Sequence, residues 1–389
     1  ACFALAIFAA LGIAFSRNLF TLFLFYELLT LSTYPLVTHY GDDEARHAGR
    51  TYLGILLTTS ILFLLLAIVW TWHVSGTLEF SPGGILAGRV DGPLVAVLLA
   101  LYAFGTGKAA LMPFHRWLPA AMVAPTPVSA LLHAVAIVKA GVFTILKVIV
   151  YVFGIDFLTE TGASIWLMYA ASFTLLTASV IALTKDNLKA RLAYSTISQL
   201  AYIVLGAALA TATGVFGSGM HIAMHAVGKI TLFFCAGAIF VATHKKNVSE
   251  MDGLGRTMPF TLTAFFVASM SIIGLPPTGG SWSKWYLALG AAEGHHAIFV
   301  GVFMISSLLS IGYLMPVVGR AFFFAPAPAH DAESTQGAGE ASASGFWSSI
   351  KEAPVLCVAP LCVTATGCIL LFFYAPKVLD LLQTMSLGR

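Results

Sequence analysis

The chain has 389 residues, of which 59% are hydrophobic and only 10% are charged. Soluble domains carry about 25% charged residues, so this composition excludes a water-soluble globular fold. The net charge of +3 comes from basic residues scattered through short segments, which excludes a nucleic-acid-binding face. The five cysteines lie singly in apolar runs, and no glycine-rich nucleotide fingerprint is present. We therefore expect no disulfide, no metal or iron–sulfur site and no other cofactor.

Apolar runs of about 20 residues, the length that crosses a bilayer as a helix, recur along the chain. They predict an all-α polytopic membrane protein with about 11 transmembrane helices. The expected spans are 1–15, 19–38, 51–72, 93–123, 127–150, 164–184, 192–210, 215–243, 258–290, 297–320 and 354–375.

The fourth and ninth of these spans are too long for one simple crossing, and each contains helix breakers. Pro113 and Pro119 interrupt the fourth span, and the PPTGG run at 276–280 interrupts the ninth. Broken helices at membrane depth persist only where protein or a wet cavity surrounds them. Because the two breaks lie five spans apart, they predict two inverted five-helix repeats, a pattern typical of ion pathways.

The domain organisation follows from this pattern. We expect the first inverted repeat at 1–161 (spans 1–5) and the second at 162–324 (spans 6–10). Residues 325–352 are rich in Ala, Ser, Gly and Pro and predict a flexible cytoplasmic linker, after which 353–389 would hold the terminal transmembrane helix. Eleven loop Lys and Arg fall on one side of this topology and four on the other. This bias predicts that the basic loops lie in the cytoplasm. The membrane would be the inner membrane of a bacterium or an archaeon.

Five lysines and one acid remain inside the predicted spans once the loop charges are assigned. They are Lys108, Lys139, Lys147, Lys229, Lys284 and Glu27. An ionisable group at mid-membrane costs about 2.5–3.5 kcal/mol, so we expect these groups to face one another or water. Lys147 lies close to the end of its span, where its ammonium can reach the headgroups. Glu27 is the one in-span partner for a lysine, and we predict a Glu27–Lys108 ion pair.

Histidines add a second set of titratable groups. His221, His225 and Lys229 follow one another at four-residue intervals and share one helix face. Imidazole titrates near physiological pH, so this face suits a proton relay. Two alternatives stay open: histidines that only hydrogen-bond within the bundle, and a zinc site, which the lack of a Glu or Cys ligand disfavours. His133 lies about 240° around the helix from Lys139 and either links Lys108 to Lys139 or simply packs.

Four ordered stretches carry a family resemblance. GKAALMPFHRWLPAAMVAPTPVSALLHAVAIVKAGVF resembles the antiporter-like proton-translocating membrane subunits of respiratory complex I, Mrp-type sodium/proton antiporters and membrane-bound hydrogenases. KDNLKARLAYSTISQLAYI, HIAMHAVGKITLFFCAGAIF and IIGLPPTGGSWSKWYL are similar to further stretches in the same order. The resemblance covers about residues 20–320, and FYELLTLSTYPLVTHYG and AGRTYL resemble the Mrp-type branch.

This resemblance implies two broken helices that each bear a key charge, and a polar axis across the membrane midplane. The first span here matches the family's fourth helix. By position, the residues that match the family's proton path are Glu27 (the glutamate), Lys108 and Lys284 (the broken-helix charges), Lys139 (the bridging lysine), and His221, His225 and Lys229 (the central relay).

The expected function is proton translocation by one subunit of a multi-subunit complex of the Mrp cation/proton antiporter, complex I-like or hydrogenase type. Its partners would be other membrane subunits, protons, the lipid bilayer and, in an antiporter, sodium. The subunit would hold no redox or hydrolytic centre of its own. Two other classes stay open: an autonomous secondary transporter for a solute such as bicarbonate, and a non-conducting scaffold. Transport by the purified single chain would favour the autonomous transporter. Unchanged proton flux in a Lys108→Ala variant would favour the scaffold.

Overall fold

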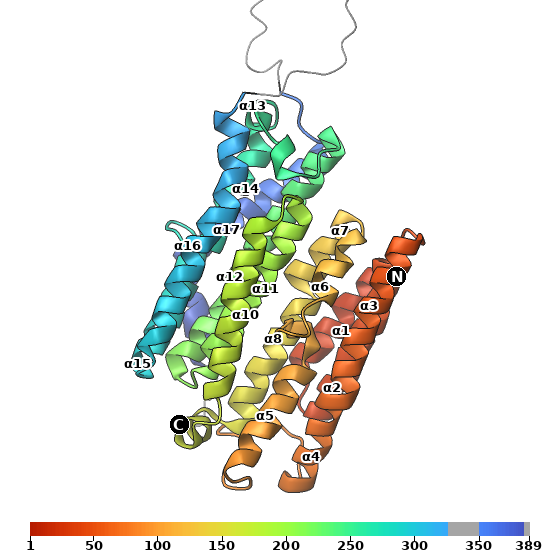
Figure 1. Cartoon of the computed structure of the whole chain (residues 1–389). Helices are drawn as coiled ribbons and strands as arrows, with labels where there is room; N and C mark the ends of the chain where they lie inside the picture. Colours follow the sequence, from red (N-terminus) through yellow and green to blue (C-terminus); the bar gives the residue numbers. More distant parts are fainter. Residues whose placement is uncertain (326–349, 385–389) are drawn as a thin grey trace, which may run out of the picture.

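The computed structural model of the chain describes residues 1–325 and 350–384. Over these residues the fold is helical, and the only extended pairings are two isolated β-bridges. The long helices run side by side between two ends of the molecule (Figure 1). The prediction of an all-α architecture is confirmed.

The first half of the bundle contains nine α-helices. They are α1 (Cys2–Phe15), α2 (Leu19–Val37), α3 (Asp43–Thr59), α4 (Leu66–Ser75), α5 (Pro93–Gly105), α6 (Trp117–Ala120), α7 (Thr126–Ala130), α8 (Ile137–Val148) and α9 (Ile155–Thr161). A π-helical segment, Ser60–Leu65, joins α3 to α4, and another, Leu131–Val135, joins α7 to α8. α3 and α4 are therefore parts of one continuous helical rod, and so are α7 and α8.

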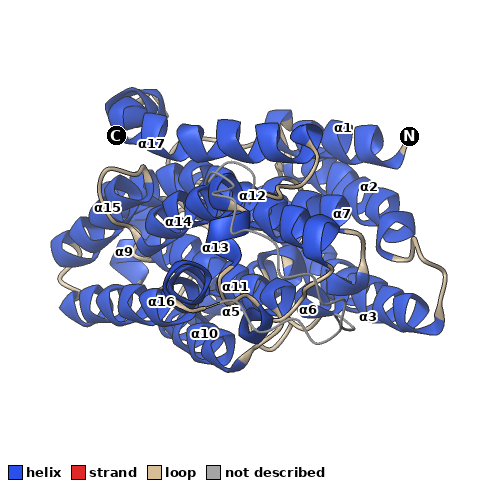
Figure 2. Ribbon diagram, turned by 90° about the horizontal axis from the view of Figure 1, so that it is seen from above, coloured by secondary structure: helices blue, strands red, loops and turns tan. Residues whose placement is uncertain are grey.

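The second half contains the remaining helices. They are α10 (Ile165–Thr184), α11 (Leu188–Ala208), α12 (Ala212–Thr243), α13 (Leu254–Thr257), α14 (Pro259–Ile273), α15 (Gly280–Glu293), α16 (Ala297–Phe323) and α17 (Val355–Gln383). Seen from above, α1 and α17 lie along the same edge of the bundle (Figure 2). The predicted linker at 325–352 falls almost entirely outside the described residues.

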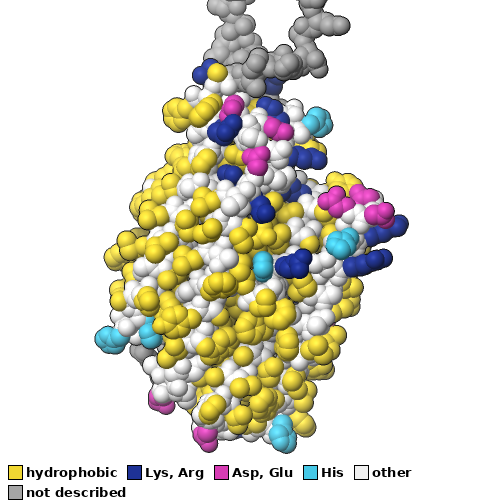
Figure 3. Space-filling model, viewed as in Figure 1, with side chains coloured by type: hydrophobic (Ala, Val, Ile, Leu, Met, Phe, Trp, Pro, Cys, Tyr) yellow, Lys and Arg dark blue, Asp and Glu magenta, His cyan; other side chains and the backbone are white. Residues whose placement is uncertain are grey.

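The surface and the helix lengths identify an integral membrane protein. Among the described residues, seven helical rods are long and apolar enough to cross a membrane, and α1, α5 and α14 are shorter apolar helices. Hydrophobic side chains cover the flank of the molecule, whereas charged side chains gather toward its ends (Figure 3). An apolar outer surface of this kind is what lipid contact requires. The expected number of about 11 crossings stays a prediction.

Charged loops distinguish the two ends of the bundle. We call the end that carries the connections 38–42, 185–187 and 244–253 the basic end, because Lys185, Lys245 and Lys246 lie there. The other end, with the connections 76–92 and 294–296, is called the opposite end.

Both predicted helix breaks are present. The chain leaves the helix at 106–116 between α5 and α6, apart from one 3-10 turn at Gly107–Ala109, and at 274–279 between α14 and α15. Pro113 lies in the first break, but Pro119 lies in the first turn of α6, where proline removes no helical hydrogen bond. Lys108 lies within its break. Lys284 follows the second break and is the fifth residue of α15.

The two halves share features that an inverted repeat would produce. α2 and α11, the second long helix of each predicted repeat, both follow an asparagine cap. Asn18 and Asn187 accept hydrogen bonds of 2.7 and 3.1 Å from the backbone N–H three residues on. Each asparagine also forms an isolated antiparallel bridge to the segment after the third rod of its half, Asn18 with Glu79 and Asn187 with Asn247. These matches support the repeats, whose boundaries at 1–161 and 162–324 stay predictions.

Candidate functional site

The ionisable side chains predicted from the sequence lie inside the bundle. Lys108, His133 and Lys229 are fully buried. His221, His225 and Lys139 are also buried, with at most 8% of the residue surface exposed. Glu27 and Lys284 are half-buried residues. Because such groups are costly away from water, the contacts that each one makes decide what the site can do.

Lys108 is held by α2. Its Nζ donates to the Tyr26 carbonyl at 2.9 Å and to Thr30 Oγ1 at 2.6 Å, and lies 3.1 Å from the centroid of the Tyr26 ring. The Tyr26 hydroxyl also accepts from the backbone N–H of Lys108 at 3.1 Å. One tyrosine therefore satisfies both the ammonium and a backbone donor that the broken helix leaves without a helical partner.

The predicted Glu27–Lys108 ion pair is wrong. Both carboxylate oxygens of Glu27 are buried and find no hydrogen-bond donor in the part of the chain that the structure describes. The break brings the Lys108 ammonium against a backbone carbonyl and a hydroxyl of α2 instead, which the sequence pattern could not reveal. Glu27 is left as a buried acceptor next to the tyrosine that carries Lys108.

Lys139 joins the two halves. Its Nζ, on α8, is hydrogen-bonded to Nδ1 of His225 on α12. The His225 ring stacks on His221, with centroids 6.0 Å apart and an angle of 19° between the planes. The His221 ring in turn stacks on Tyr202 of α11, at 5.5 Å and 27°. These contacts form a row of polar groups that crosses from the first half into the second.

The surroundings of His221 accept either protonation state. Its Nε2 lies 3.1 Å from Gln199 Oε1 and its Nδ1 lies 2.9 Å from Ser283 Oγ. The Ser283 hydroxyl has a second acceptor in the Gly280 carbonyl at 3.0 Å. A neutral ring can therefore accept from Ser283, whereas a charged ring can donate to Gln199 and Ser283 together while Ser283 turns to Gly280.

Lys284 closes the row at the second break. Its Nζ donates to the Ile273 carbonyl and to Ser307 Oγ, both at 3.0 Å, and to the Tyr202 hydroxyl at 3.4 Å. It also lies 4.5 Å from the centroid of the Tyr202 ring. Ile273 is the last residue of α14, so the ammonium caps a helix C-terminus, where a positive charge is favoured.

Besides Glu27 and Lys108, two more of the predicted residues lie outside this row. His133 packs on Phe233 with ring centroids 5.2 Å apart, and neither of its ring nitrogens finds a partner among the residues described. It does not link Lys108 to Lys139. Lys229 donates to the Leu192 carbonyl of α11 at 3.2 Å and lies beside the histidine pair rather than between it and Lys284.

Lys147 lies toward the opposite end, as expected for a lysine near the end of its span. Its Nζ donates to the Ser16 carbonyl at 2.6 Å and lies 4.3 Å from the Phe80 ring centroid. It lines an open cavity of about 380 Å³ together with Ser16 and Arg17.

This arrangement can be compared with known proteins. Residues 16–310 match the family described as "NADH:quinone oxidoreductase/Mrp antiporter, TM". The chain belongs to this family. The resemblance predicted from the four sequence stretches is thereby confirmed.

Relatives within the NADH:quinone oxidoreductase/Mrp antiporter family come from different complexes. The chain is 34% identical over 330 residues to NADH-quinone oxidoreductase subunit N of Desulforudis audaxviator, covering 83% of this chain and 64% of the relative. It is 32% identical over 285 residues to hydrogenase-4 component B of Escherichia coli, covering 69% and 41%. A chain in the structure of the Mrp complex from Dietzia sp. DQ12-45-1b has the same fold, with a TM-score of 0.82 and 23% identity over 98% of this chain and 76% of that chain.

The chain spans less than two thirds of the length of these two curated relatives.

Several side chains that complete the site in this family member were missed by sequence reasoning. They are Tyr26, Thr30, Tyr202, Ser283 and Ser307. None of them carries a charge, so none stood out in an apolar span. Gln199 is a polar residue of α11, but nothing in its spacing pointed to His221 on α12.

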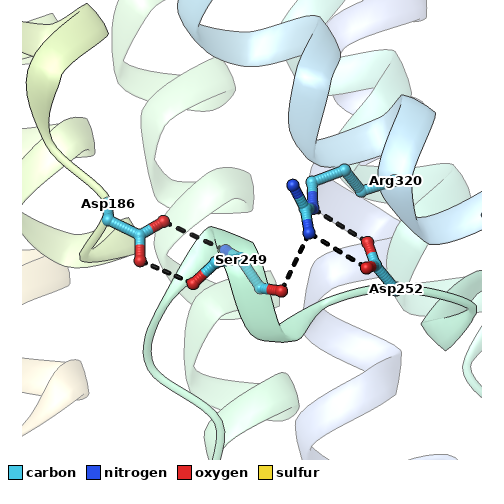
Figure 4. Close-up of polar contacts among 4 residues, drawn as sticks. All are labelled: Asp186, Ser249, Asp252 and Arg320. Carbon is cyan, nitrogen blue, oxygen red and sulfur yellow. Dashed lines mark hydrogen bonds and ion pairs between the residues drawn. The ribbon is translucent and has the colours of Figure 1, made fainter. Parts of the chain in front are cut away.

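Loops at the basic end are held together by a separate polar cluster. Ser249 donates its hydroxyl and its backbone N–H to Asp186 at 2.6 and 3.0 Å, and Arg320 forms an ion pair with Asp252 at 2.8 Å (Figure 4). Arg320 also donates to the Ser249 carbonyl at 3.0 Å. The hydrogen bonds from Ser249 lower the pKa of Asp186. This cluster fixes the end of α16 against the loops that precede α11 and follow α12.

A surface cleft also opens at the basic end. It has a volume of about 490 Å³ and includes Lys189, Lys245 and Lys246 among its lining residues. None of the eight predicted proton-path residues lines it, so the buried row is a separate feature.

Proposed function

We propose that the chain is a proton-translocating, antiporter-like subunit of a multi-subunit membrane complex. The observation that carries the proposal is the buried row Lys139–His225–His221–Tyr202–Lys284, which joins the two halves through hydrogen bonds and stacked rings. Lysine, histidine and tyrosine side chains each bind and release a proton at nitrogen or oxygen. Membership of the NADH:quinone oxidoreductase/Mrp antiporter family supports the same conclusion.

Proton movement along the row follows from its contacts. A charged Lys139 donates its proton to Nδ1 of a neutral His225, which leaves a neutral amine and an imidazolium. The imidazolium is stacked against His221 without a hydrogen bond between the rings, so a water molecule at His225 Nε2 would have to pass the proton on. The two hydrogen-bonding partners of His221 accommodate its charged form. A positive charge on His221 disfavours a second positive charge on nearby Lys284, so arrival of one proton promotes release of the next.

Glu27 and Lys108 form the entrance to this row in the first half. Glu27 has two buried carboxylate oxygens that find no hydrogen-bond donor in the described chain, so they are free to accept a proton. Lys108 is seated on the neighbouring tyrosine. Lys229 and His133, which lie beside the row, would adjust the field on His225 rather than carry the proton through.

The complex that we propose is of the Mrp cation/proton antiporter, complex I-like or hydrogenase type. The relatives are named as subunits of an NADH-quinone oxidoreductase and a hydrogenase, and the structural neighbour belongs to an Mrp complex. Other membrane subunits would be its partners, and sodium its counter-ion in an antiporter. The excess of Lys and Arg at the basic end supports a cytoplasmic location of that end in a bacterial or archaeal inner membrane.

The decisive experiment removes the contact between the halves. Lys139→Ala, in the purified complex reconstituted in vesicles, is expected to lower dye-reported proton uptake about 100-fold, the scale of losing one positioned proton donor. The control is Lys377→Ala, which removes an exposed lysine from α17 and leaves flux unchanged. Normal uptake by both Lys139→Ala and Lys284→Ala would exclude the relay and leave a scaffold role. Uptake by the purified single chain would favour an autonomous transporter.

A further inference from the structure

A cationic cavity opens at the opposite end, where α8 meets the connection between α1 and α2. Its volume of about 380 Å³ falls in the range of about 300–1,000 Å³ that is usual for small-molecule sites. Two basic side chains line it, Lys147 of α8 and Arg17 of the connection, and no acidic side chain does. None of the residues of the buried row lines it either. The cavity is therefore separate from the proton path and carries two positive charges.

Lys147 is half-buried and has no counter-ion in the part of the chain that the structure describes. Its ammonium has three N–H donors, and the Ser16 carbonyl at 2.6 Å and hydroxyl at 3.4 Å take at most two of them. The ring centroids of Phe80 and Phe143 lie 4.3 and 5.7 Å from its nitrogen. Aromatic faces stabilise a cation but do not compensate its charge. An anion that enters the cavity would therefore meet both an N–H donor and an uncompensated charge.

Arg17 supplies the second positive charge from the rim of the cavity. Its side chain is largely exposed, and its ion pair with Glu79, at 3.4 Å, is exposed as well. Such exposed pairs are weak, and Glu79 does not line the cavity. A guanidinium has five N–H donors in a planar fork that matches the oxygens of a phosphate. Arg17 can therefore bind an anion together with Lys147.

The general distribution of loop charges does not account for these two cations. Basic residues are few in the loops on this side, four against eleven on the other. Lys147 is a further cation inside an apolar helix, where an ionisable group is costly. A lysine that only snorkels extends its ammonium to water, whereas Nζ of Lys147 points to Ser16 and to the Phe80 ring. The pair of cations is therefore a local property of the cavity.

Apolar side chains form most of the remaining wall. The rings of Phe80 and Tyr151 pack edge to face, with centroids 6.3 Å apart. On α1 the wall includes Ala14, which lies between the exposed side chains of Leu11 and Phe15 in the sequence. These belong to the apolar surface of the bundle that faces lipid. The cavity thus fits a ligand with a negative charge at one end and apolar chains at the other.

We propose that this cavity binds the headgroup of an anionic phospholipid from the leaflet at the opposite end. The phosphate accepts hydrogen bonds from Lys147 and Arg17, and the acyl chains lie along the exposed face of α1. A zwitterionic headgroup would bring its own ammonium close to two cations, with no acidic lining residue to receive it. The depth also agrees, because the connection after α1 follows a predicted membrane span and therefore lies at headgroup level. The inference goes beyond proton translocation and does not depend on it.

The test measures binding of phosphatidylglycerol to the purified full chain in detergent by native mass spectrometry. Lys147→Gln is expected to weaken binding of the first lipid about five-fold, the contribution of one basic residue close to anionic lipid, and Arg17→Gln by a similar factor. Lys147→Arg keeps the charge and should keep the affinity. The matched control is Lys377→Gln, which removes an exposed lysine near the end of α17, outside the cavity, and should leave binding unchanged.

Two other probes identify the ligand. Phosphatidylcholine should bind more weakly than phosphatidylglycerol, and Lys147→Gln should not alter its binding. Inorganic phosphate should not displace the bound lipid, because it gains none of the apolar contacts. Displacement by phosphate would show a small-anion site, and an equal dependence of both lipids on Lys147 would show a site without preference for charge. Either result would overturn the proposal.

The variants also separate a specific site from general attraction of anionic lipid. If Lys147→Gln, Arg17→Gln and Lys377→Gln bind phosphatidylglycerol equally well, the lipid follows the surface charge and the proposal fails. Arg17 is largely exposed, so Arg17→Gln decides the question even where Lys147→Gln does not fold. Because binding rather than proton uptake is measured, failure of this inference leaves the proposed function untouched.

Discussion

In the first half of the bundle Lys108 lies within the helix break and contacts Tyr26 of α2, whereas in the second half Lys284 lies beyond the break and contacts Tyr202 of α11. Tyr26 is eight residues after the cap of its helix at Asn18, and Tyr202 is fifteen residues after the cap at Asn187. The difference of seven residues is two helical turns, or about 10.5 Å. The capping and bridging of the two halves match, but the lysines do not occupy equivalent positions.

This difference has a consequence for depth in the membrane. α2 begins at the opposite end and α11 begins at the basic end, so strict inversion would place the two tyrosines at mirrored depths. Tyr26 lies about 12 Å along α2 from the opposite end, and Tyr202 lies about 9 Å from the end of α11 on that same side. A shift of two turns keeps a residue on the same helix face. The helix caps and bridges therefore obey the inverted repeat. The two tyrosines that contact the lysines instead lie at similar depths in the membrane.

The two halves also differ in the chemistry around each lysine. Tyr26 is followed by the carboxylate of Glu27, and Tyr202 is followed by the apolar Ile203. Neutral partners surround Lys284 instead: Ser307, the Tyr202 hydroxyl and the Ile273 carbonyl. We therefore expect the first half to depend on a charge and the second half to depend on hydroxyl groups.

The strongest test of this comparison removes the charge from the first half. Glu27→Gln keeps the shape of the side chain and removes the carboxylate that follows Tyr26, the tyrosine in contact with Lys108. We expect proton uptake to fall about 10- to 100-fold, because the acid acts as a proton acceptor in a positioned relay. Initial rates of dye-reported uptake in vesicles measure the effect.

The matched control for that change is Glu44→Gln, which alters an exposed acid in the first turn of α3. Its flux should equal that of the unaltered chain. Unchanged flux in Glu27→Gln would remove the charge-dependent role of the first half.

Removal of the hydroxyl group from each tyrosine is expected to have a smaller effect. We expect a loss of proton flux in the second half and a loss of stability in the first half. Tyr202→Phe removes a hydroxyl that contacts the Lys284 ammonium and Ser307, so flux should fall several-fold to about 10-fold. Tyr26→Phe removes a hydroxyl that accepts from a backbone N–H, so it should leave flux nearly unchanged and cost about 1–3 kcal/mol of stability. Transport assays and thermal unfolding of both variants, carried out in parallel, measure this crossed pattern.

If both tyrosine variants instead lose flux equally and keep their stability, the two lysines have equivalent roles and the comparison fails.

The smallest effect concerns the loops that anchor the two halves. Asp186→Asn removes the acceptor charge for Ser249 at the basic end and should lower stability by less than about 1 kcal/mol, the scale of exposed polar pairs. Because the hydrogen bonds lower the pKa of Asp186, its contribution is present above the ordinary value of 3.8 and is lost as the pH falls through the lowered value. Melting temperatures measured from neutral to acid pH should therefore converge for the two proteins.

The corresponding ion pair of the first half is a natural control. Arg17 and Glu79 lie 3.4 Å apart and are both largely exposed, so Glu79→Gln should produce no measurable change in the melting temperature. If Glu79→Gln lowers the melting temperature more than Asp186→Asn does, the loop contacts at the basic end are not the more stabilising ones.

The amino-acid sequence alone determined the membrane class, the all-helical architecture, the two breaks and the set of buried lysines and histidines. These properties depend on hydropathy along one segment and on the local effects of proline and glycine, so neighbouring residues suffice to predict them. The four-residue spacing of His221 and His225 likewise placed both rings on one face, as the stacked pair requires.

Only the tertiary structure decided which groups meet. Lys139 and His225 are 86 residues apart, and their contact depends on how α8 packs against α12. The predicted Glu27–Lys108 pair failed for the same reason, because a break between α5 and α6 sets the direction of the lysine and no periodicity encodes that direction. Tyr202, Ser283 and Ser307 also escaped prediction, since an uncharged hydroxyl in an apolar helix becomes informative only when its partners on other helices are known.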